Sequence, residues 1–165
     1  MPKRVFFSFD FSEDLWRASV VRNRWVADPA LAAGGLWSPQ FTAGSPPDRA
    51  ALERFVDEQV EAADVTAVLI GARTAGCEHV LHAIRRSAEL GRGLLGIHVD
   101  QCRNRYGSMG TRGRNPFDRV TFYRDGREES MADSVPIYDW VSDDGYRNLP
   151  EWIDEAATRS ATRDS

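Results

Sequence analysis

The chain has 165 residues, a length suited to one domain with a sizeable hydrophobic core. Its residues are 42% hydrophobic and 10% aromatic, which excludes a largely disordered protein. The formal net charge of -4 gives no reason to expect nucleic acid or an anionic membrane as a partner, and no apolar run reaches transmembrane length. Cys77 and Cys102 form no Cys-x-x-Cys pair. We therefore expect free thiols, no metal site and a cytoplasmic location.

The first strand and helix are predicted by an aromatic run followed by a helical pattern. Residues 4–9 read Arg-Val-Phe-Phe-Ser-Phe, a composition typical of a β-strand, and Asp10 follows where the strand ends. The spacing then predicts a helix over residues 13–26 with Ser12 as its N-cap. Its inner stripe comprises Leu15, Ala18, Val21 and Trp25, and Trp16 and Val20 widen it.

The sequence pattern for the second strand is weaker than that for the first. Residues 34–38 (Gly-Gly-Leu-Trp-Ser) predict a short second strand. After a loop rich in Gly, Ser and Pro, the sequence Ser45-Pro46-Pro47-Asp48 opens the next helix. Ser45 is its expected N-cap, with Pro46 in the first helical position and Asp48 at the capping-box position.

The central unit of the chain is a predicted strand–helix–strand. Residues 65–70 and 94–99 are short apolar runs that suit strands buried on both faces. Between them, apolar residues recur at helical spacing, and Gly91 marks the end of the helix. Two parallel strands joined by a helix form a βαβ unit with a right-handed crossover.

The remaining chain combines an arginine-containing loop, further strands and a last helix. Residues 100–115 carry four arginines among glycines, which indicates either a phosphate-binding flap or a solvated loop. Strands are predicted at residues 120–123 and 135–141, with a tight turn at Asp125-Gly126. An amphipathic helix with Pro150 in its first turn completes a single domain over residues 1–157, and residues 158–165 are expected to be a disordered tail. The four arginines are Arg103, Arg105, Arg112 and Arg114.

This order of elements predicts an α/β fold, an open doubly wound parallel sheet with helices on both faces. The first strand is too apolar for an edge, so we expect a flavodoxin-like strand order with that strand inside the sheet. Ligands of such sheets bind at the carboxyl ends of the strands. That rule places Ser8, Phe9 and Asp10 beside residues 70–73 and the start of the central helix.

Six segments carry a resemblance to a known family. They are residues 3–9 (KRVFFSF), 20–26 (VVRNRWV), 68–71 (VLIG), 96–98 (GIH), 115–118 (NPFD) and 138–146 (YDWVSDDGY). Over nearly its whole length the chain resembles the TIR-like proteins of the bacterial Thoeris antiphage system, of the ThsB type. The resemblance implies a flavodoxin-like TIR fold. It also implies cleavage of the nicotinamide–ribose bond of NAD, which is then a substrate and not a cofactor, and release of an ADP-ribose-derived signal that activates a partner effector. A phage protein as trigger and self-association are further interactions that such a role suggests.

The implied reaction requires a carboxylate beside the ribose. Nicotinamide leaves as a neutral amine, and an oxocarbenium-like ribose needs a nearby negative charge. In the family this group is a Glu on the helix after the third strand, and the alignment places Ala83 at that position and His79 where a Trp is expected. Two explanations are open: Ala83 replaces a catalytic Glu in a disabled enzyme, or the chain is a natural non-catalytic relative. Asp10 is the best-placed alternative acid, and its other interpretation is a turn residue.

Two further functions stay open beside the enzyme. One is a TIR-like module that senses a nucleotide or a phage protein without turning it over. The other is a nucleoside-processing transferase of similar fold. The predicted substrate-binding residues are Phe7, Ser8, Phe9, Asp10, Trp37, Phe41, Arg73, His79 and Asn115. Several have simpler interpretations, such as core packing for Trp37 and a turn role for Asn115.

Overall fold

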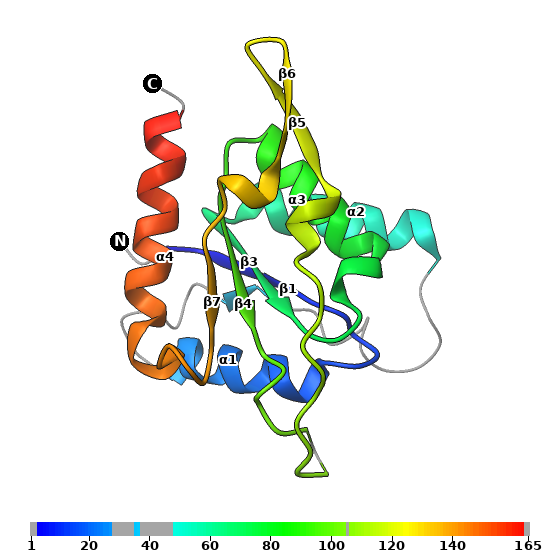
Figure 1. Cartoon of the computed structure of the whole chain (residues 1–165), viewed down its shortest axis with the longest axis vertical. Coiled ribbons are helices and arrows are strands. Elements are labelled where there is room, and N and C mark those ends of the chain that lie inside the picture. Colours follow the sequence, from blue (N-terminus) through cyan, green and yellow to red (C-terminus); the bar gives the residue numbers. More distant parts are fainter. Residues whose placement is uncertain (1–2, 28–34, 37–47, 105, 164–165) are drawn as a thin grey trace.

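The computed structural model describes residues 3–27, 35–36, 48–104 and 106–163 (Figure 1). A five-stranded parallel sheet has the strand order β2-β1-β3-β4-β7. β1 lies inside the sheet, as its apolar sequence predicts. The flavodoxin-like doubly wound fold is therefore confirmed. The strands are β1 (Val5–Ser8), β2 (Gly35–Leu36), β3 (Val65–Ile70), β4 (Gly93–His98) and β7 (Ile137–Asp139).

Helices cover both faces of this sheet. The side chains of alternate residues on β1, β3 and β4 pack with α1 and α4 into one core, which includes Phe7, Trp25 and Trp152. The opposite face packs against α3 and α2, with Phe6 and Phe55 meeting edge to face at 6.2 Å. The helices are α1 (Leu15–Ala27), α2 (Arg49–Ala62), α3 (Glu78–Glu89) and α4 (Gly145–Arg163).

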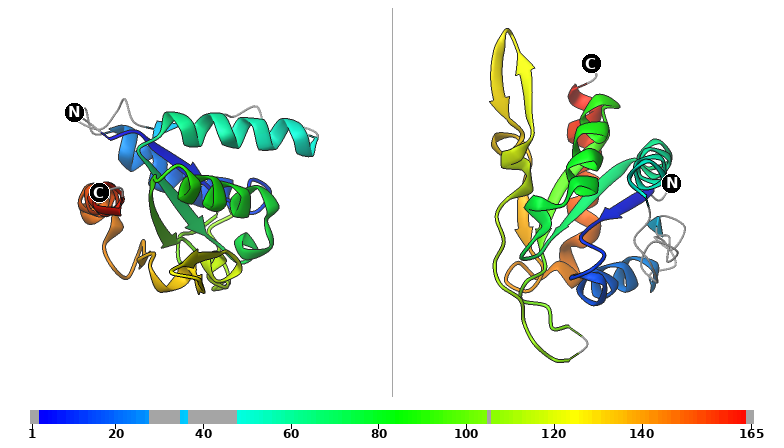
Figure 2. Two further views of the ribbon diagram at one scale, coloured as in Figure 1. Left: turned by 90° about the horizontal axis from the view of Figure 1, so that it is seen from above. Right: turned by 90° about the vertical axis from the view of Figure 1, so that its right-hand side faces the viewer.

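A second, antiparallel sheet is formed by β5 (Thr121–Arg124) and β6 (Arg127–Ser130), which projects from the body of the molecule (Figures 1 and 2). The predicted turn between them is confirmed, because Asp125 and Gly126 have positive φ angles of 53° and 78°. Short 3₁₀ helices at Thr74–Gly76, Pro116–Arg119 and Met131–Asp133 complete the described elements.

Both predicted helix caps are corrected by the structure. α1 begins at Leu15, and the backbone N–H and hydroxyl of Ser12 instead donate to Oδ1 of Asp10. α2 begins at Arg49 with Asp48 as its N-cap, whose Oδ1 accepts from the N–H of Ala51 at 2.7 Å. Ser45 lies outside the described residues. Asp48 therefore serves as the N-cap of α2 in place of the capping-box role expected for it.

The buried face of α1 is narrower in the structure than the sequence predicts. Ala18, Val21 and Trp25 are buried as predicted, but Trp16 and Val20 are 55% and 40% exposed. The three inward residues fill the space beside β1, so the flank carrying Trp16 and Val20 faces solvent.

α4 is longer than its sequence pattern predicts. It continues to Arg163, so residues 158–163 are helical where a disordered tail is expected. It also begins at Gly145, which puts Pro150 inside the helix. Proline has no N–H to donate to the carbonyl four residues back, which is that of Tyr146. Nε of Arg24 on α1 donates to that carbonyl instead. No helix in the described ranges is both long and apolar enough to span a membrane.

Candidate functional site at the carboxyl edge of the sheet

The carboxyl ends of the strands bring the predicted residues together. Ser8 pairs with Val68, and Ile70 pairs with His98. The segment after β1 therefore lies beside the segment after β3, which leads into α3. The predicted neighbourhood of Ser8, Phe9 and the start of α3 is confirmed by a hydrogen bond from His79 Nε2 to the carbonyl oxygen of Phe9, at 2.8 Å.

His79 is held in one tautomer. Since the Phe9 carbonyl can only accept, Nε2 carries the proton, and Nδ1 accepts from the Cys77 thiol at 3.1 Å. The imidazole stacks on Phe11 with ring centroids 4.6 Å apart. Burial lowers the pKa of His79 and raises the pKa of the Cys77 thiol to about 12. Both groups are neutral near pH 7, so this pair positions the chain and supplies no thiolate nucleophile.

Ser8 and Asp10 differ in what their side chains contact. Ser8 is buried, and its Oγ has no hydrogen-bond partner within the described part of the chain. Asp10 is also buried, but its Oδ1 accepts from Ser12 twice, at 3.1 and 2.8 Å. Asp10 therefore closes the turn after β1, whereas the Ser8 hydroxyl is one of the buried polar groups without a described hydrogen-bond partner at this edge, together with Oδ2 of Asp14 and Nδ1 of His98.

Three of the other predicted site residues have structural roles. Phe7 and Phe9 are 1% exposed and belong to the core. Asn115 accepts from the N–H of Phe117 and caps a 3₁₀ helix. Arg73 is at the surface, 3.4 Å from Glu13. Trp37 and Phe41 lie outside the described residues.

Ala83, at the position of the expected catalytic Glu, has no exposed surface. It lies one turn after His79 on α3 and packs in the cluster that contains Phe6 and Phe55. α3 begins at the carboxyl edge and continues into the layer between β1 and α2. A single helical turn therefore separates His79, at the edge, from Ala83, in the core.

A buried ion pair near this edge was not singled out by sequence reasoning. Asp14 and Arg17 are 1% and 7% exposed and lie 3.2 Å apart. Arg17 also donates to the carbonyl oxygens of Cys102 and Ser108. Burial raises the pKa of Asp14 to about 6. The i,i+3 spacing of an acid and an arginine is the local signal, but the sequence cannot show that both are buried.

The loop after β4, which ends at residue 115, contacts the rest of the domain through a further arginine, besides its hydrogen bonds with Arg17. Arg112 forms ion pairs with Asp100 and Asp139. Arg103 donates to the carbonyl of Gly107 within the loop itself. Arg105 lies outside the described residues. Most described residues from 103 to 114 are exposed, so the loop is solvated as one of the two interpretations expects, although these contacts hold it to the body. It lies beside α1 at the lower end of Figure 1.

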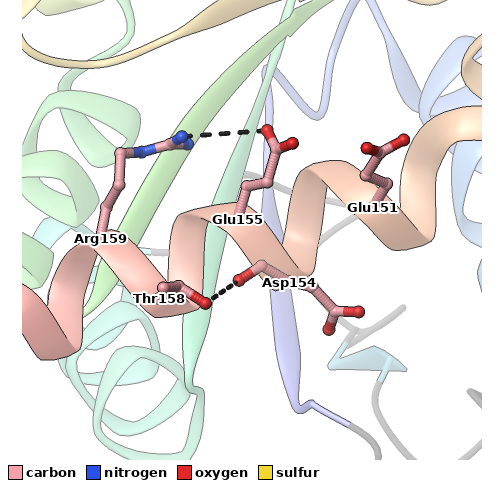
Figure 3. A pocket seen from close by; sticks show the side chains of 5 residues that line it. All are labelled: Glu151, Asp154, Glu155, Thr158 and Arg159. Atoms are coloured by element: carbon pink, nitrogen blue, oxygen red, sulfur yellow. Dashed lines mark hydrogen bonds and ion pairs between the residues drawn. The ribbon is translucent and has the colours of Figure 1, made fainter.

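Two surface pockets lie in the described part of the structure, one of them beside the candidate site. One, of about 670 Å³, lies between the start of α1 and the loop residues Asn104 and Tyr106, next to the carboxyl edge, and Phe11 lines it. The other lies along α4, where Arg159 pairs with Glu155 and Thr158 donates to the carbonyl of Asp154 (Figure 3). The second contains none of the predicted site residues.

The match to known proteins is consistent with this geometry. A family model described as "Thoeris protein ThsB, TIR-like domain" matches residues 6–104. The chain belongs to this family. A relative in Bacillus cereus (strain MSX-D12) is named "Putative cyclic ADP-D-ribose synthase ThsB1" and is 29% identical over 191 aligned residues. The match covers 93% of this chain and 100% of that protein.

The matched region of this ThsB-type TIR-like domain contains the candidate site. It runs from within β1 to the start of the loop after β4, and so includes Ser8, His79, Ala83 and the Asp14–Arg17 pair. Among the described residues, no group of three or more His, Cys, Asp and Glu side chains could hold a metal ion.

Proposed function

We propose that this ThsB-type protein binds NAD, or an ADP-ribose derivative of it, at the carboxyl edge of its sheet. The observation that carries the proposal is the buried Ser8 hydroxyl without a described partner, at an edge where the backbone of Phe9 is fixed by His79. A ribose hydroxyl can donate to and accept from a serine hydroxyl. The exposed Arg73 lies near the same edge and can neutralise a diphosphate, since an exposed ion pair such as Arg73–Glu13 contributes little stability.

The reaction class that we propose is that of NAD nucleosidases and ADP-ribosyl cyclases. In that reaction the bond between nicotinamide and ribose breaks, and water or a nucleophilic atom of the substrate takes the ribosyl carbon. A carboxylate at position 83 would stabilise the positive ribosyl centre. The methyl group of Ala83 cannot do so, and loss of one such group typically costs about 10²–10³ in rate. We therefore expect the chain to bind NAD and to release nicotinamide very slowly.

In the Thoeris setting, an active form would release an ADP-ribose-derived signal that reaches its effector by diffusion. The effector would then bind the nucleotide and would not need to contact this chain. A phage protein is the proposed trigger.

One observation favours a second candidate, a nucleotide-sensing module without turnover. Ala83 is fully enclosed in an apolar cluster, and both ring nitrogens of His79 are already hydrogen-bonded. Packing therefore fills the places where the family alignment expects a carboxylate and a tryptophan.

The experiment compares the chain with Ala83→Glu and Ala83→Gln for NAD binding and nicotinamide release. Glu and Gln have nearly the same volume, so both variants disturb the core alike and differ in charge. The enzymatic proposal expects nicotinamide release from Ala83→Glu and background release from the other two. If Ala83→Glu folds and binds NAD but releases no nicotinamide, the sensing module is supported. If the chain with Ala83 cleaves NAD at a normal rate, the assignment of position 83 is wrong.

A further inference from the structure

Two aromatic side chains near the carboxyl edge are largely exposed and lie outside the buried core. Trp16 on α1 is 55% exposed and Tyr106 in the loop after β4 is 77% exposed. Both line the pocket of about 670 Å³, a volume within the range of about 300–1,000 Å³ that is typical of small-molecule sites. Two large rings exposed in one pocket offer stacking surfaces for a planar ligand.

The polar groups of the pocket suit a base with ring acceptors. Oδ1 of Asn104 accepts from the N–H groups of Tyr106 and Ser108, so its amide nitrogen, a donor, is the end left for a ligand. Ser12 and Glu13 line the same pocket. Glu13 pairs with Arg73, which follows β3, and so a cation lies between the pocket and the carboxyl edge. A phosphate attached to a base in the pocket would be within the field of that cation.

The pocket and residue 83 lie on opposite faces of the sheet. α1 packs on the face of the sheet that carries Phe7, and α3 packs on the opposite face. A dinucleotide that crosses the carboxyl edge would therefore place one base on the α1 side and the other on the α3 side. Since the ribosyl bond to nicotinamide must lie near position 83, the base on the α1 side is the adenine.

We infer that the pocket between Trp16 and Tyr106 is an adenine-binding subsite, with Arg73 beside it as the contact for the adjoining phosphate. This inference rests on the proposed function for the identity of the dinucleotide. The purine-binding pocket itself can be tested without any turnover.

The test measures AMP and nicotinamide mononucleotide binding by calorimetry, for the chain and four variants. Tyr106→Ala has a matched control in Tyr123→Ala, because Tyr123 is also 77% exposed but lies on the projecting hairpin. Trp16→Ala is matched by Val20→Ala, one turn further along α1. Loss of one base–aromatic stack should weaken AMP binding roughly 5- to 100-fold in Tyr106→Ala and Trp16→Ala. The two controls should bind AMP like the parent, and nicotinamide mononucleotide should bind all five proteins alike.

The outcomes separate this inference from the proposed function. If AMP binding is absent at millimolar concentration, or is equal in Tyr106→Ala and Tyr123→Ala, the adenine subsite is refuted. If the stack-dependent AMP binding is found while Ala83→Glu releases no nicotinamide, the subsite holds and the proposed reaction fails. If Ala83→Glu cleaves NAD with a KM that neither aromatic substitution changes, the reaction holds and the subsite is refuted.

Discussion

Gly113 lies directly against Gly71, so that a β-carbon added to Gly113 would be 2.0 Å from the carbonyl oxygen of Gly71. This contact joins the loop after β4 to the end of β3. On its other side, a β-carbon on Gly71 would be 2.0 Å from Oδ2 of Asp14. Three segments that are distant in the sequence therefore meet at one point beside the candidate site, and two of them must be glycine there.

The first prediction follows from this contact. Gly113→Ala should lower the free energy of unfolding by about 1–3 kcal/mol, because the backbone atoms it meets cannot rotate away. Gly76→Ala is the control, since a β-carbon on Gly76 meets nothing within 4 Å. Denaturant unfolding of both variants measures the difference. Equal stabilities would mean that the loop does not pack against β3 in solution.

The second prediction concerns the pH dependence of stability through Asp14. The folded state raises its pKa from 3.8 to about 6, so the folded state binds more protons than the unfolded state between these values. Stability that depends on Asp14 should therefore increase as the pH falls from about 6 to about 4, and the cost of the buried charge is fully present above pH 6. Asp14→Asn should stabilise the protein at pH 7 by at most about 3 kcal/mol, and this gain should vanish near pH 4.

The comparison needs a surface control and a check on Arg17. Asp118→Asn, at an exposed position, is the surface control measured beside Asp14→Asn. Arg17 keeps its bonds to Cys102 and Ser108 in Asp14→Asn, so the loop stays attached. Constant destabilisation of Asp14→Asn at every pH would show that the ion pair with Arg17 outweighs the burial of the carboxylate.

The third prediction concerns the two thiols, which are free. Burial raises the pKa of Cys77 to about 12 and that of Cys102 to about 11. Since the thiolate is the reactive form, both should react with iodoacetamide at pH 8 far more slowly than the same cysteines in denatured protein. His79→Asn removes the imidazole that accepts from Cys77 and should change the rate at Cys77 but not at Cys102. Rapid alkylation of Cys77 in the folded chain would contradict the assigned protonation state of the Cys77–His79 pair.

The parts of the fold that the sequence predicts well are those set by local patterns. β3 follows from an apolar run, and the end of α3 follows from Gly91, which has a φ of 68° and comes directly after the C-cap Leu90. The alternation of β1 correctly separates Phe7 from Phe6, because a strand has a period of two.

The site depends on contacts that have no local signal. The approach of Gly113 to Gly71 and the bonds from Arg17 to the loop after β4 join residues far apart in the chain. Helical periodicity predicts which residues of α1 share a face, but it does not predict how much of that face the sheet covers. The exposure of Trp16 depends on that coverage. Ala83 is similar: the spacing places it on the flank of His79, but only the packing of α2 shows that it is buried.

The last prediction concerns the carbonyl oxygen of Tyr146, which links α1 to α4. Pro150 cannot donate to this oxygen, and Nε of Arg24 does so instead. Arg24→Met should therefore lower the free energy of unfolding by about 0.5–1.5 kcal/mol, the usual net contribution of one hydrogen bond. In a Pro150→Ala background, the N–H of residue 150 can donate to the same carbonyl, so Arg24→Met should cost less stability there.

The Arg24 guanidinium also lies 4.8 Å from the centre of the Tyr146 ring, but that contact does not involve residue 150 and cancels in the double-mutant cycle. Chemical unfolding of the four proteins gives the coupling energy. Strictly additive effects would mean that Arg24 stabilises α4 through the ring contact and not by replacing the hydrogen bond that Pro150 cannot donate.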